Sequence, residues 1–415
     1  MLYEILVRGY ILVIWLASFF NPKARKWLVG RRDWRGQIAQ NFRKKGKTLW
    51  LHAASLGEFE QGRPVIEALK KEFPGWQVVL TFFSPSGFEV RKNYPHADFI
   101  CYLPADTARN ARDFIQLIQP DVAVFVKYEF WHNYLTELKK RSTPTLLVSS
   151  IFRESQPFFK WYGGFWRRML GCFSHLFVQD AASKNLLQNI GFQNVTVAGD
   201  TRIDRVLAIA ESAPDNQIVQ NFCRREPRPV LIAGSSWAAD EDVFLPLPAS
   251  LRDKFQLIVA PHEVSEKRVA EIAGRFLGNP ASVVRYSRAE NHTFTTERLL
   301  IIDNIGLLNT IYKYGTVAYI GGGFGAGIHN ILEPAAFGLP VIFGPRFQKF
   351  EEARQLLARG GAFSVKNAAE FEAVLTKLTD PDFYQKASAA ARGWLLENRG
   401  ATAQILNYLR RTLDG

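Results

Sequence analysis

From residue 48 onward, short apolar runs alternate with segments that carry apolar residues at helical spacing. The runs TLWL (48–51), WQVVLTFFS (76–84) and DVAVFVKYEF (121–130) are typical of buried strands, and TARNARDFIQLIQ (107–119) is typical of an amphipathic helix. Further short strands are expected at ADFICYLPAD, TPTLLVSSIF, SHLFVQD and VTVAGD. Nearly continuous apolar strands between helices predict a parallel sheet covered on both faces.

The alternation stops at the polar, proline-bearing residues 211–229 and then resumes. The second set of expected strands comprises PVLIAGSS, KFQLIVAPHE, LLIIDNIG, GTVAYIGGG and LPVIFGP. A chain of 415 residues is long enough for two cores. We therefore predict two doubly wound, Rossmann-type α/β domains, whose strand ends can face each other across a cleft. The expected parts are an apolar and basic segment (1–47), a first domain (48–207), a linker (208–228), a second domain (229–380), and C-terminal helices (381–415) that can pack back on the first domain.

The N-terminal segment carries most of the excess positive charge. Residues 1–50 hold eleven Lys and Arg against Glu4 and Asp33, or 11 − 2 = +9 of the net charge of +13. They also contain the apolar stretch Gly9–Phe20, which is too short to span a bilayer and has no cleavage site after it. An apolar helix with a basic flank is typical of anchoring at an anionic membrane surface. The alternative is a helix buried against the protein, with a solvated basic loop.

Composition excludes several other classes of protein. The three cysteines, Cys101, Cys172 and Cys223, are far apart and odd in number, which indicates free thiols rather than a disulfide framework or a zinc site. No familiar nucleic-acid-binding module accompanies the basic run, so no nucleic-acid partner is expected.

In parallel sheets of this kind, ligands bind outside the carboxyl ends of the strands, so the loops there carry the candidate chemistry. The stretch HAASLGEFEQG (52–62) follows the first strand and opens a helix with Glu58 in its first turn. Ser55 and Glu58 fit a capping box, which is the structural interpretation. The functional interpretation is a catalytic base displayed at the edge of the sheet.

Two further loops of the first domain place charges after strands. VKYEFWHN sets Glu129 beside Lys127, and AGDTRID puts Arg202 near the domain junction. The arginine could neutralise a departing phosphate, or it could form a surface ion pair.

In the second domain, YIGGGFGAGIHNILEPAAFGLPVIFGP (319–345) predicts a strand, a glycine loop and a helix that begins near His329. Glycines let the backbone approach a ligand, and a helix N-terminus offers N–H groups to a phosphate. The pattern Gly321-x-Gly323-x-x-Ala326 nearly matches a dinucleotide fingerprint, but the next strand lacks the acidic residue that the fingerprint needs. Glu333, one turn past Asn330, could instead accept two ribose hydroxyls, or it could form a salt bridge.

The remaining loops of the second domain offer weaker signals. Ser235 or Ser236 could bind a phosphate or cap a helix, and His262 could stack on a base or be solvated. Asp240 and Asp242 spell D-x-D, but their place in a helical first turn favours complementarity with the helix dipole over a metal site.

Taken together, HAASLGE, KYEFWHN, AGDTRID, APHE, DNIGLL and GIHNILEPAAFGLPVIFGP resemble, in order, the motifs of the Kdo transferases, which are membrane-associated glycosyltransferases of lipopolysaccharide synthesis. The resemblance spans nearly the whole chain. It implies a GT-B fold, a CMP-Kdo donor and a lipid A precursor (lipid IVA) as acceptor. It also implies a place on the cytoplasmic face of the inner membrane, either peripheral or held by the N-terminal helix, and neither cofactor nor metal ion.

Residue by residue, the resemblance makes Glu58 the general base and gives Arg202 a role in stabilising the transition state. Known members have an acid where this chain has Lys127 and a proline where it has His132, so Glu129 could cover part of the acid's role. The residues expected to contact the nucleotide, from the resemblance and from the loop positions, are Ser235, Ser236, Pro261, His262, Ile305, Gly306, Leu307, Gly323, Asn330, Ile331, Leu332 and Glu333.

The expected reaction is an inverting displacement, in which Glu58 accepts the proton of a glucosamine hydroxyl that attacks the anomeric carbon of Kdo. Two alternatives remain from the sequence. One is another GT-B nucleotide-sugar enzyme, such as a lipid A disaccharide synthase or a sugar epimerase. The other is a noncatalytic adaptor at the membrane surface.

Overall fold

The computed structural model describes residues 2–276 and 282–413, so the first residue and the last two residues of the expected terminal segments lie outside the described residues. The chain forms two compact units. Unit 1 comprises the residues up to Asp204 and those from Arg399 onward, and unit 2 comprises Arg205–Asn398. The chain therefore leaves unit 1 within one helix, α10 (Thr201–Ser212), and returns to it between two others.

Unit 1 is built on a seven-stranded sheet with the order β3-β2-β1-β4-β5-β6-β7, and every described strand pair is parallel. Its strands are β1 (Thr48–Ala53), β2 (Gln77–Phe82), β3 (Phe99–Tyr102), β4 (Val122–Val126), β5 (Thr145–Ser150), β6 (His175–Val178) and β7 (Val195–Val197). Its helices are α1 (Leu2–Ala17), α2 (Pro22–Val29), α3 (Trp34–Asn41), α4 (Leu56–Glu72), α5 (Pro85–Arg91), α6 (Ala108–Ile118), α7 (His132–Lys140), α8 (Gly164–Leu170), α9 (Ala181–Asn189) and α20 (Ala401–Leu413), with a 3-10 turn η1 (Pro157–Phe159). The predicted doubly wound sheet is confirmed.

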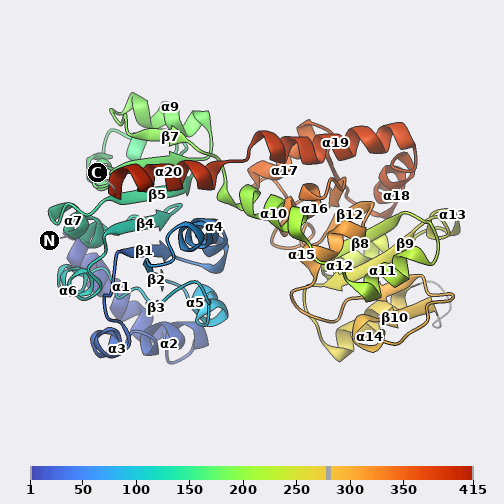
Figure 1. Ribbon diagram of the computed structural model, residues 1–415, viewed down its shortest axis with the longest axis horizontal. Coiled ribbons are helices and arrows are strands. Elements are labelled where there is room, and N and C mark those ends of the chain that lie inside the picture. Colours follow the sequence, from blue (N-terminus) through green and yellow to red (C-terminus); the bar gives the residue numbers. More distant parts are fainter. Residues whose placement is uncertain (1, 277–281, 414–415) are drawn as a thin grey trace. The chain divides into compact units, whose positions relative to one another are not determined.

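Alternation along β1 creates a separate core on each face of this sheet. Leu49 and Leu51 point into a cluster completed by α4 and α20, whereas Trp50 points into a cluster completed by α6 and α7. Figure 1 shows the strands from β7 to β3, with α20 lying across the sheet beside α4. Because the strands are buried on both faces, their polar residues can gather only at the carboxyl edge, which is where the candidate chemistry lies.

The N-terminal helix α1 rests on the surface of unit 1 through polar contacts. The Tyr3 hydroxyl donates to Asp106 Oδ2 at 2.6 Å, and Glu4 Oε1 accepts from the N–H of Ala108 at 2.6 Å, at the start of α6. None of the side chains of α1 is fully buried, and its apolar residues are largely exposed. Across residues 2–276 and 282–413, no helix has both the length and the apolar character needed to cross a bilayer.

Part of the N-terminal basic charge is used inside the protein. The guanidinium of Arg31 donates to the carbonyls of Trp27, Phe83 and Leu103 and lies 3.8 Å from the centre of the Trp27 ring. Burial lowers the pKa of Arg31 to about 9. Arg35 is paired with Asp113 at 2.6 Å. These contacts show that the basic residues of the segment include structural ones.

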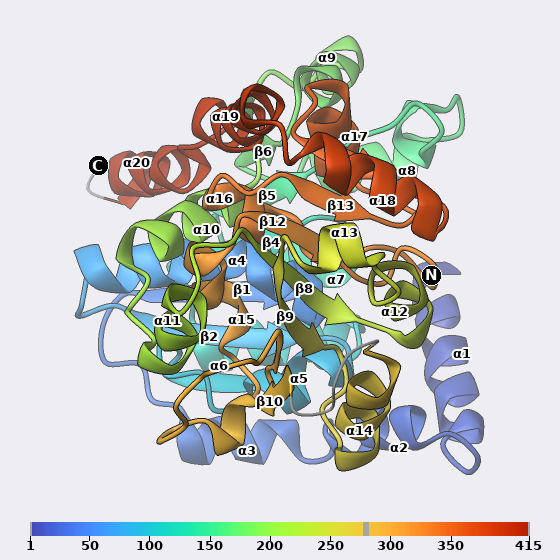
Figure 2. The ribbon, with the colours of Figure 1, turned by 90° about the vertical axis from the view of Figure 1, so that its right-hand side faces the viewer.

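Unit 2 is built on a second seven-stranded parallel sheet, with the strand order β10-β11-β9-β8-β12-β13-β14, and it differs from unit 1 in that β11 lies between β10 and β9. Its strands are β8 (Val230–Ser236), β9 (Gln256–Pro261), β10 (Val283–Arg285), β11 (Leu299–Ile301), β12 (Val317–Ile320), β13 (Val341–Phe343) and β14 (Ala362–Ser364). Its helices are α11 (Gln217–Arg224), α12 (Ala238–Phe244), α13 (Ala249–Arg252), α14 (Glu266–Arg275), α15 (Leu308–Ile311), α16 (Leu332–Ala336), α17 (Glu351–Ala358), α18 (Ala368–Lys377) and α19 (Pro381–Glu397), with 3-10 turns η3 (Tyr286–Arg288) and η4 (Tyr312–Tyr314). Figure 2, which faces unit 2, shows the strands running from β10 through β9, β8 and β12 to β13.

The structure differs from the sequence expectations at a few places in unit 2. The helix expected from near His329 begins instead at Leu332, because Gly322 and Gly327 adopt φ values of +91° and +137° and keep the chain in a loop. The edge strands β10 and β14 were not expected from the apolar runs. Residues 208–228 contain the end of α10 and the helix α11, and α20 packs its apolar face into a core of unit 1.

Candidate functional site

Glu58 lies at the carboxyl edge of the unit 1 sheet, in the first turn of α4. The helix begins at Leu56 with Ser55 as its cap, and Glu58 Oε2 accepts from the backbone N–H of Ser55 at 3.0 Å and from its hydroxyl at 3.3 Å. The predicted capping box is therefore present. Burial raises the pKa of the Glu58 carboxyl above its ordinary value, and the negative charge of Glu129 raises it further. Among the described residues, Oε1 of Glu58 has no hydrogen-bond partner, so one oxygen is held and the other is available.

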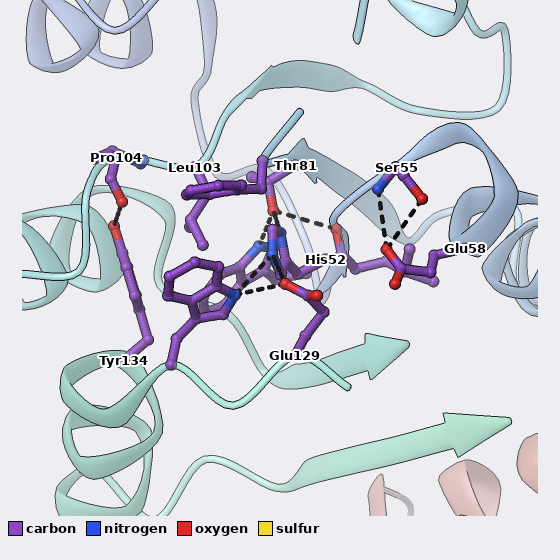
Figure 3. A network of polar contacts seen from close by, with 12 residues as sticks. His52, Ser55, Glu58, Thr81, Leu103, Pro104, Glu129 and Tyr134 are labelled. Carbon is purple, nitrogen blue, oxygen red and sulfur yellow. Dashed lines mark hydrogen bonds and ion pairs between the residues drawn. The ribbon is translucent and has the colours of Figure 1, made fainter. Parts of the chain in front are cut away.

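Behind Glu58, a buried network joins β1, β2 and β4 (Figure 3). Nδ1 of His52 lies 2.8 Å from the hydroxyl of Thr81, and its Nε2 lies 3.0 Å from Glu129 Oε2. The indole N–H of Trp131 donates to the same carboxylate oxygen at 2.7 Å, and Trp50 donates to Thr81 at 2.9 Å. Because Trp131 can only donate, Glu129 accepts from two rings at once, which fixes the carboxylate near Glu58.

Lys127 turns the chain between β4 and Glu129. Its φ is +60°, a left-handed conformation that is uncommon for a residue with a side chain. The turn bends the chain directly after β4, so that Glu129 reaches His52. The Lys127 ammonium opposes the raised pKa of Glu58 and contributes to a lowered pKa at Asp200. The structure thus gathers Glu58, Lys127 and Glu129 at one edge, as their positions after β1 and β4 predicted.

Arg202 is anchored by a buried carboxylate two residues before it. Its Nε and Nη2 donate to Asp200 Oδ2 at 2.9 and 2.6 Å. Burial would raise the pKa of Asp200, but the Arg202 charge and hydrogen bonds hold it below its ordinary value. Gln61 of α4 donates to the same oxygen at 3.1 Å, one turn after Glu58. The ion pair expected as the structural interpretation of Arg202 is therefore formed, and it orients the guanidinium at the end of β7.

In unit 2, the glycine loop after β12 packs tightly against two neighbouring loops. A side chain at Gly321 would come within 2.2 Å of the carbonyl oxygen of Ser235, and one at Gly323 would come within 2.6 Å of the backbone of Gly344. Ser235 is itself left-handed, with φ of +53°, at a bulge in β8. Only glycine fits this loop, which brings backbone N–H groups to the carboxyl edge of the sheet.

Asp240 ties the same loop to the start of α12. Its Oδ2 accepts from the N–H of Trp237 at 3.0 Å and from that of Gly322 at 2.9 Å, and its Oδ1 accepts from the hydroxyl of Tyr319 at 3.1 Å. Asp242 points elsewhere and pairs with Arg275 at 2.9 Å. The D-x-D pair is therefore divided between two structural contacts.

A stack of rings follows β8, β9 and β12. The ring of His262 lies 4.5 Å from that of Trp237 and 4.4 Å from that of His329, both nearly parallel. Trp237 donates to His329 Nε2 at 3.1 Å. Burial, together with the nearby His262, lowers the pKa of His329 to about 4. This imidazole is therefore neutral at physiological pH and can accept the indole hydrogen bond.

The remaining predicted nucleotide-contact residues divide by exposure. Pro261, Gly323, Ile331 and Leu332 are buried, so only their backbones could contact a ligand, whereas Ile305 is 93% exposed beside Gly306 and Leu307. The Ser236 hydroxyl donates to Glu241 at 3.0 Å. Asn330 donates to Glu333 at 3.0 Å and accepts from the N–H of Leu332, so it orients Glu333 and ends the loop.

Sequence reasoning missed several residues that organise both edges. His52, Thr81, Trp131, Asp200, Trp237 and His329 received no role, although His52 and Asp200 lie within the quoted motifs HAASLGE and AGDTRID. A polar residue directly after a buried strand was the available signal. The partners of His52 and Trp237 lie 29 to 92 positions away in the sequence, so a local pattern cannot identify them.

Comparison with known proteins agrees with the geometry. The family model described as 3-deoxy-D-manno-octulosonic-acid transferase (kdotransferase) matches residues 31–205. The chain is 26% identical to 3-deoxy-D-manno-octulosonic acid transferase of Haemophilus influenzae over 97% of this chain and 95% of the relative. It is 25% identical to the enzyme of the same name from Rickettsia bellii, over 86% of each chain.

Solved structures show the same fold at low identity. UDP-GlcNAc 2-epimerase from Neisseria meningitidis, bound to UDP-GlcNAc, has a TM-score of 0.60 at 16% identity and covers 88% of this chain and 100% of that one. MurG of Acinetobacter baumannii has a TM-score of 0.55 at 13% identity, with 88% and 100% coverage. The fold is thus GT-B-like. Together with the motif residues at both sheet edges, these matches show a Kdo transferase domain over residues 31–205 and similarity to glycosyltransferases of that name over nearly the whole chain.

Proposed function

We propose that the protein transfers Kdo from CMP-Kdo to a lipid A precursor, lipid IVA, with inversion at the anomeric carbon. Glu58 accepts the proton of a glucosamine hydroxyl as that oxygen attacks the anomeric carbon. The bond between Kdo and the phosphate of CMP breaks, and CMP leaves with the bonding electron pair. Arg202, oriented by Asp200, neutralises the charge that grows on the departing phosphate.

The single observation that carries this proposal is the environment of Glu58. One of its oxygens is held by the cap, and the other has no partner among the described residues. Burial and Glu129 raise its pKa, which brings its basicity closer to what a general base needs at neutral pH. If Glu58 served only as a helix cap, the negative charge of Glu129 beside it would not stabilise that cap.

The donor is assigned to the carboxyl edge of unit 2. The backbone of the glycine loop at Gly323 and the hydroxyl of Ser235 suit the phosphate, whereas the Ser236 hydroxyl is engaged by Glu241. Asn330 and Glu333 suit the ribose hydroxyls. His262 and the residues 305–307 suit the base. This proposal gives no role to a metal ion, because fixed donors and Arg202 supply the positive charge.

The acceptor is a lipid, so we place the reaction at the cytoplasmic face of the inner membrane, with the protein held there peripherally through α1. The exposed apolar residues of this helix, among them Leu12, Trp15 and Leu16, support this placement. Attraction of the surrounding basic residues to anionic lipids would add to it.

The direct test is to supply CMP-Kdo and lipid IVA to the purified protein and to analyse the product by mass spectrometry. We expect one or more Kdo additions, release of CMP in equal amount, and no loss of rate with EDTA. In a thermal-shift assay, CMP should raise the melting temperature and UDP should not. Stabilisation by UDP compounds instead, or no CMP release with both substrates present, would favour the epimerase-like or adaptor alternative.

A further inference from the structure

Next to Glu129, unit 1 contains a cavity of about 690 Å³, a size within the range of about 300–1,000 Å³ that is typical of ligand sites. The cavity lies between α1, the loop after β4, and the segment from η1 to α8. Its walls are mainly aromatic and aliphatic, with Tyr3, Leu6, Phe83, Phe130, Phe158 and Phe165 among them. Glu129 is its one charged lining residue.

A second cavity, of about 390 Å³, adjoins the first. The two share Tyr3, Leu6, Phe83 and Trp131 in their walls, so they lie side by side beneath α1, and together they are called the hollow. Its walls are mainly apolar, and Asp106, which accepts from the Tyr3 hydroxyl, also lines the second cavity. Leu6 is 62% exposed, which means that the same side chain lines the hollow and reaches the surface. The hollow thus runs from a fixed carboxylate at one end to the apolar exterior of α1 at the other.

Its position relative to Glu129 determines what kind of molecule fits. The Glu129 oxygen that accepts from His52 and Trp131 belongs to the network beside Glu58. The other carboxylate in the walls, Asp106, already accepts from Tyr3, Asn133 and Tyr134, so a ligand in the hollow would be polar at the Glu129 end and mainly apolar along the rest of its length. Trp161 and Tyr162, between η1 and α8, are 92% and 52% exposed and are of the type that gathers at membrane–water interfaces.

From this geometry we infer that the hollow beneath α1 is an acyl-chain subsite, which receives a fatty-acyl chain of the lipid acceptor while its sugar hydroxyl lies near Glu58. The inference rests on the proposed function and adds a role for α1, which becomes a wall of the acceptor site as well as a membrane contact. Each methylene buried in the hollow should tighten binding about fourfold.

The test compares two acceptors with two variants, at a fixed detergent concentration. Lipid IVA and its fully deacylated sugar bisphosphate share the hydroxyl that receives Kdo, and they differ in the acyl chains and in the hydroxyls and amines that deacylation frees. We expect the KM of the deacylated acceptor to be at least about tenfold higher, with a smaller change in kcat. Leu6→Gln should raise the KM of lipid IVA about 3- to 10-fold and leave that of the deacylated acceptor unchanged.

Leu12→Gln is the matched control, because Leu12 is 56% exposed on the same helix and is outside the walls of these two cavities. If α1 acts only as a membrane contact, or if a bystander lipid fills the hollow, the two variants will behave alike and the inference is wrong. Equal KM values for the two acceptors would also overturn it. Absence of product from either acceptor with the unmodified protein would instead refute the proposed function itself.

Discussion

Two helices that follow the central strands of the two sheets carry an acidic residue at the same position. After β1, α4 has Glu58 as its third residue, and after β8, α12 has Asp240 as its third residue. Both carboxylates accept a hydrogen bond from the N–H of their cap residue, and burial raises the pKa of both. Asp240, however, uses both oxygens on Tyr319, Trp237 and Gly322.

The difference lies in what else the carboxylate must hold. In unit 2, Asp240 supports a glycine loop, so both of its carboxylate oxygens are used in structural hydrogen bonds. In unit 1, the scaffold is completed by His52, Thr81 and Asp200, which leaves one oxygen of Glu58 for chemistry. An acidic residue at the third position of a helix after a parallel strand can therefore serve structure or catalysis, depending on the neighbours that the fold brings to it.

The largest effect expected from this comparison is that of Glu58→Gln. The amide keeps a hydrogen-bond acceptor for the Ser55 cap but cannot take a proton, so kcat should fall about 10²- to 10⁴-fold. The melting temperature should stay the same or rise slightly, since the buried carboxylate, with its raised pKa, opposes folding once it is ionised. Steady-state kinetics and calorimetry measure the two quantities.

Glu60→Gln serves as the control, because Glu60 lies on the same helix and is paired with Arg91 at 2.8 Å. It should keep activity within about twofold, since surface ion pairs contribute little. Near-normal turnover of Glu58→Gln would show that Glu58, like Asp240, has only a structural role.

The second prediction concerns the other carboxylate. Asp240→Ala leaves the Tyr319 hydroxyl and the N–H of Gly322 without their acceptor, which should lower the free energy of unfolding by about 1–3 kcal/mol and raise the KM of the donor. Asp242→Ala, two residues on, removes only a pair with Arg275 from an exposed side chain and should cost less than about 1 kcal/mol. Chemical denaturation tests both variants, and equal losses would contradict a special role for Asp240.

The smallest effect is a shift in the pH profile. Glu129→Gln removes a negative charge that raises the pKa of Glu58, so the Glu58 pKa falls. Activity is lost at low pH when Glu58 becomes protonated, and the acid limb of kcat/KM should therefore move to lower pH, by less than about one unit. Glu137→Gln, in a surface pair with Arg141, should leave the limb in place. A limb that stays fixed or moves to higher pH in Glu129→Gln would show that Glu129 does not tune the base.

Much of the fold could be predicted because buried parallel strands are apolar throughout. The edge strands β10 and β14 escaped prediction since they have three residues each, too few for a periodic signal. The start of α16 was misplaced because the conformation of the loop depends on the close approach of Gly322 to the carbonyl of Gly327 and of Gly327 to the ring of Phe350. The candidate site residues were proposed from their positions after strands, whereas their partners could not be identified from the sequence.

By itself, the sequence determined the strands of the two sheets and the loops that follow them, because apolar periodicity is a local property of the chain. It also placed Ser55 and Glu58 in a capping box, which needs only four residues. Only the tertiary structure decided that Asp240 is fully bound, that Glu58 keeps an oxygen without a partner among the described residues, and that Glu4 caps α6 across 104 positions. Such outcomes depend on contacts between distant parts of the chain, and those contacts exist only once the chain has folded.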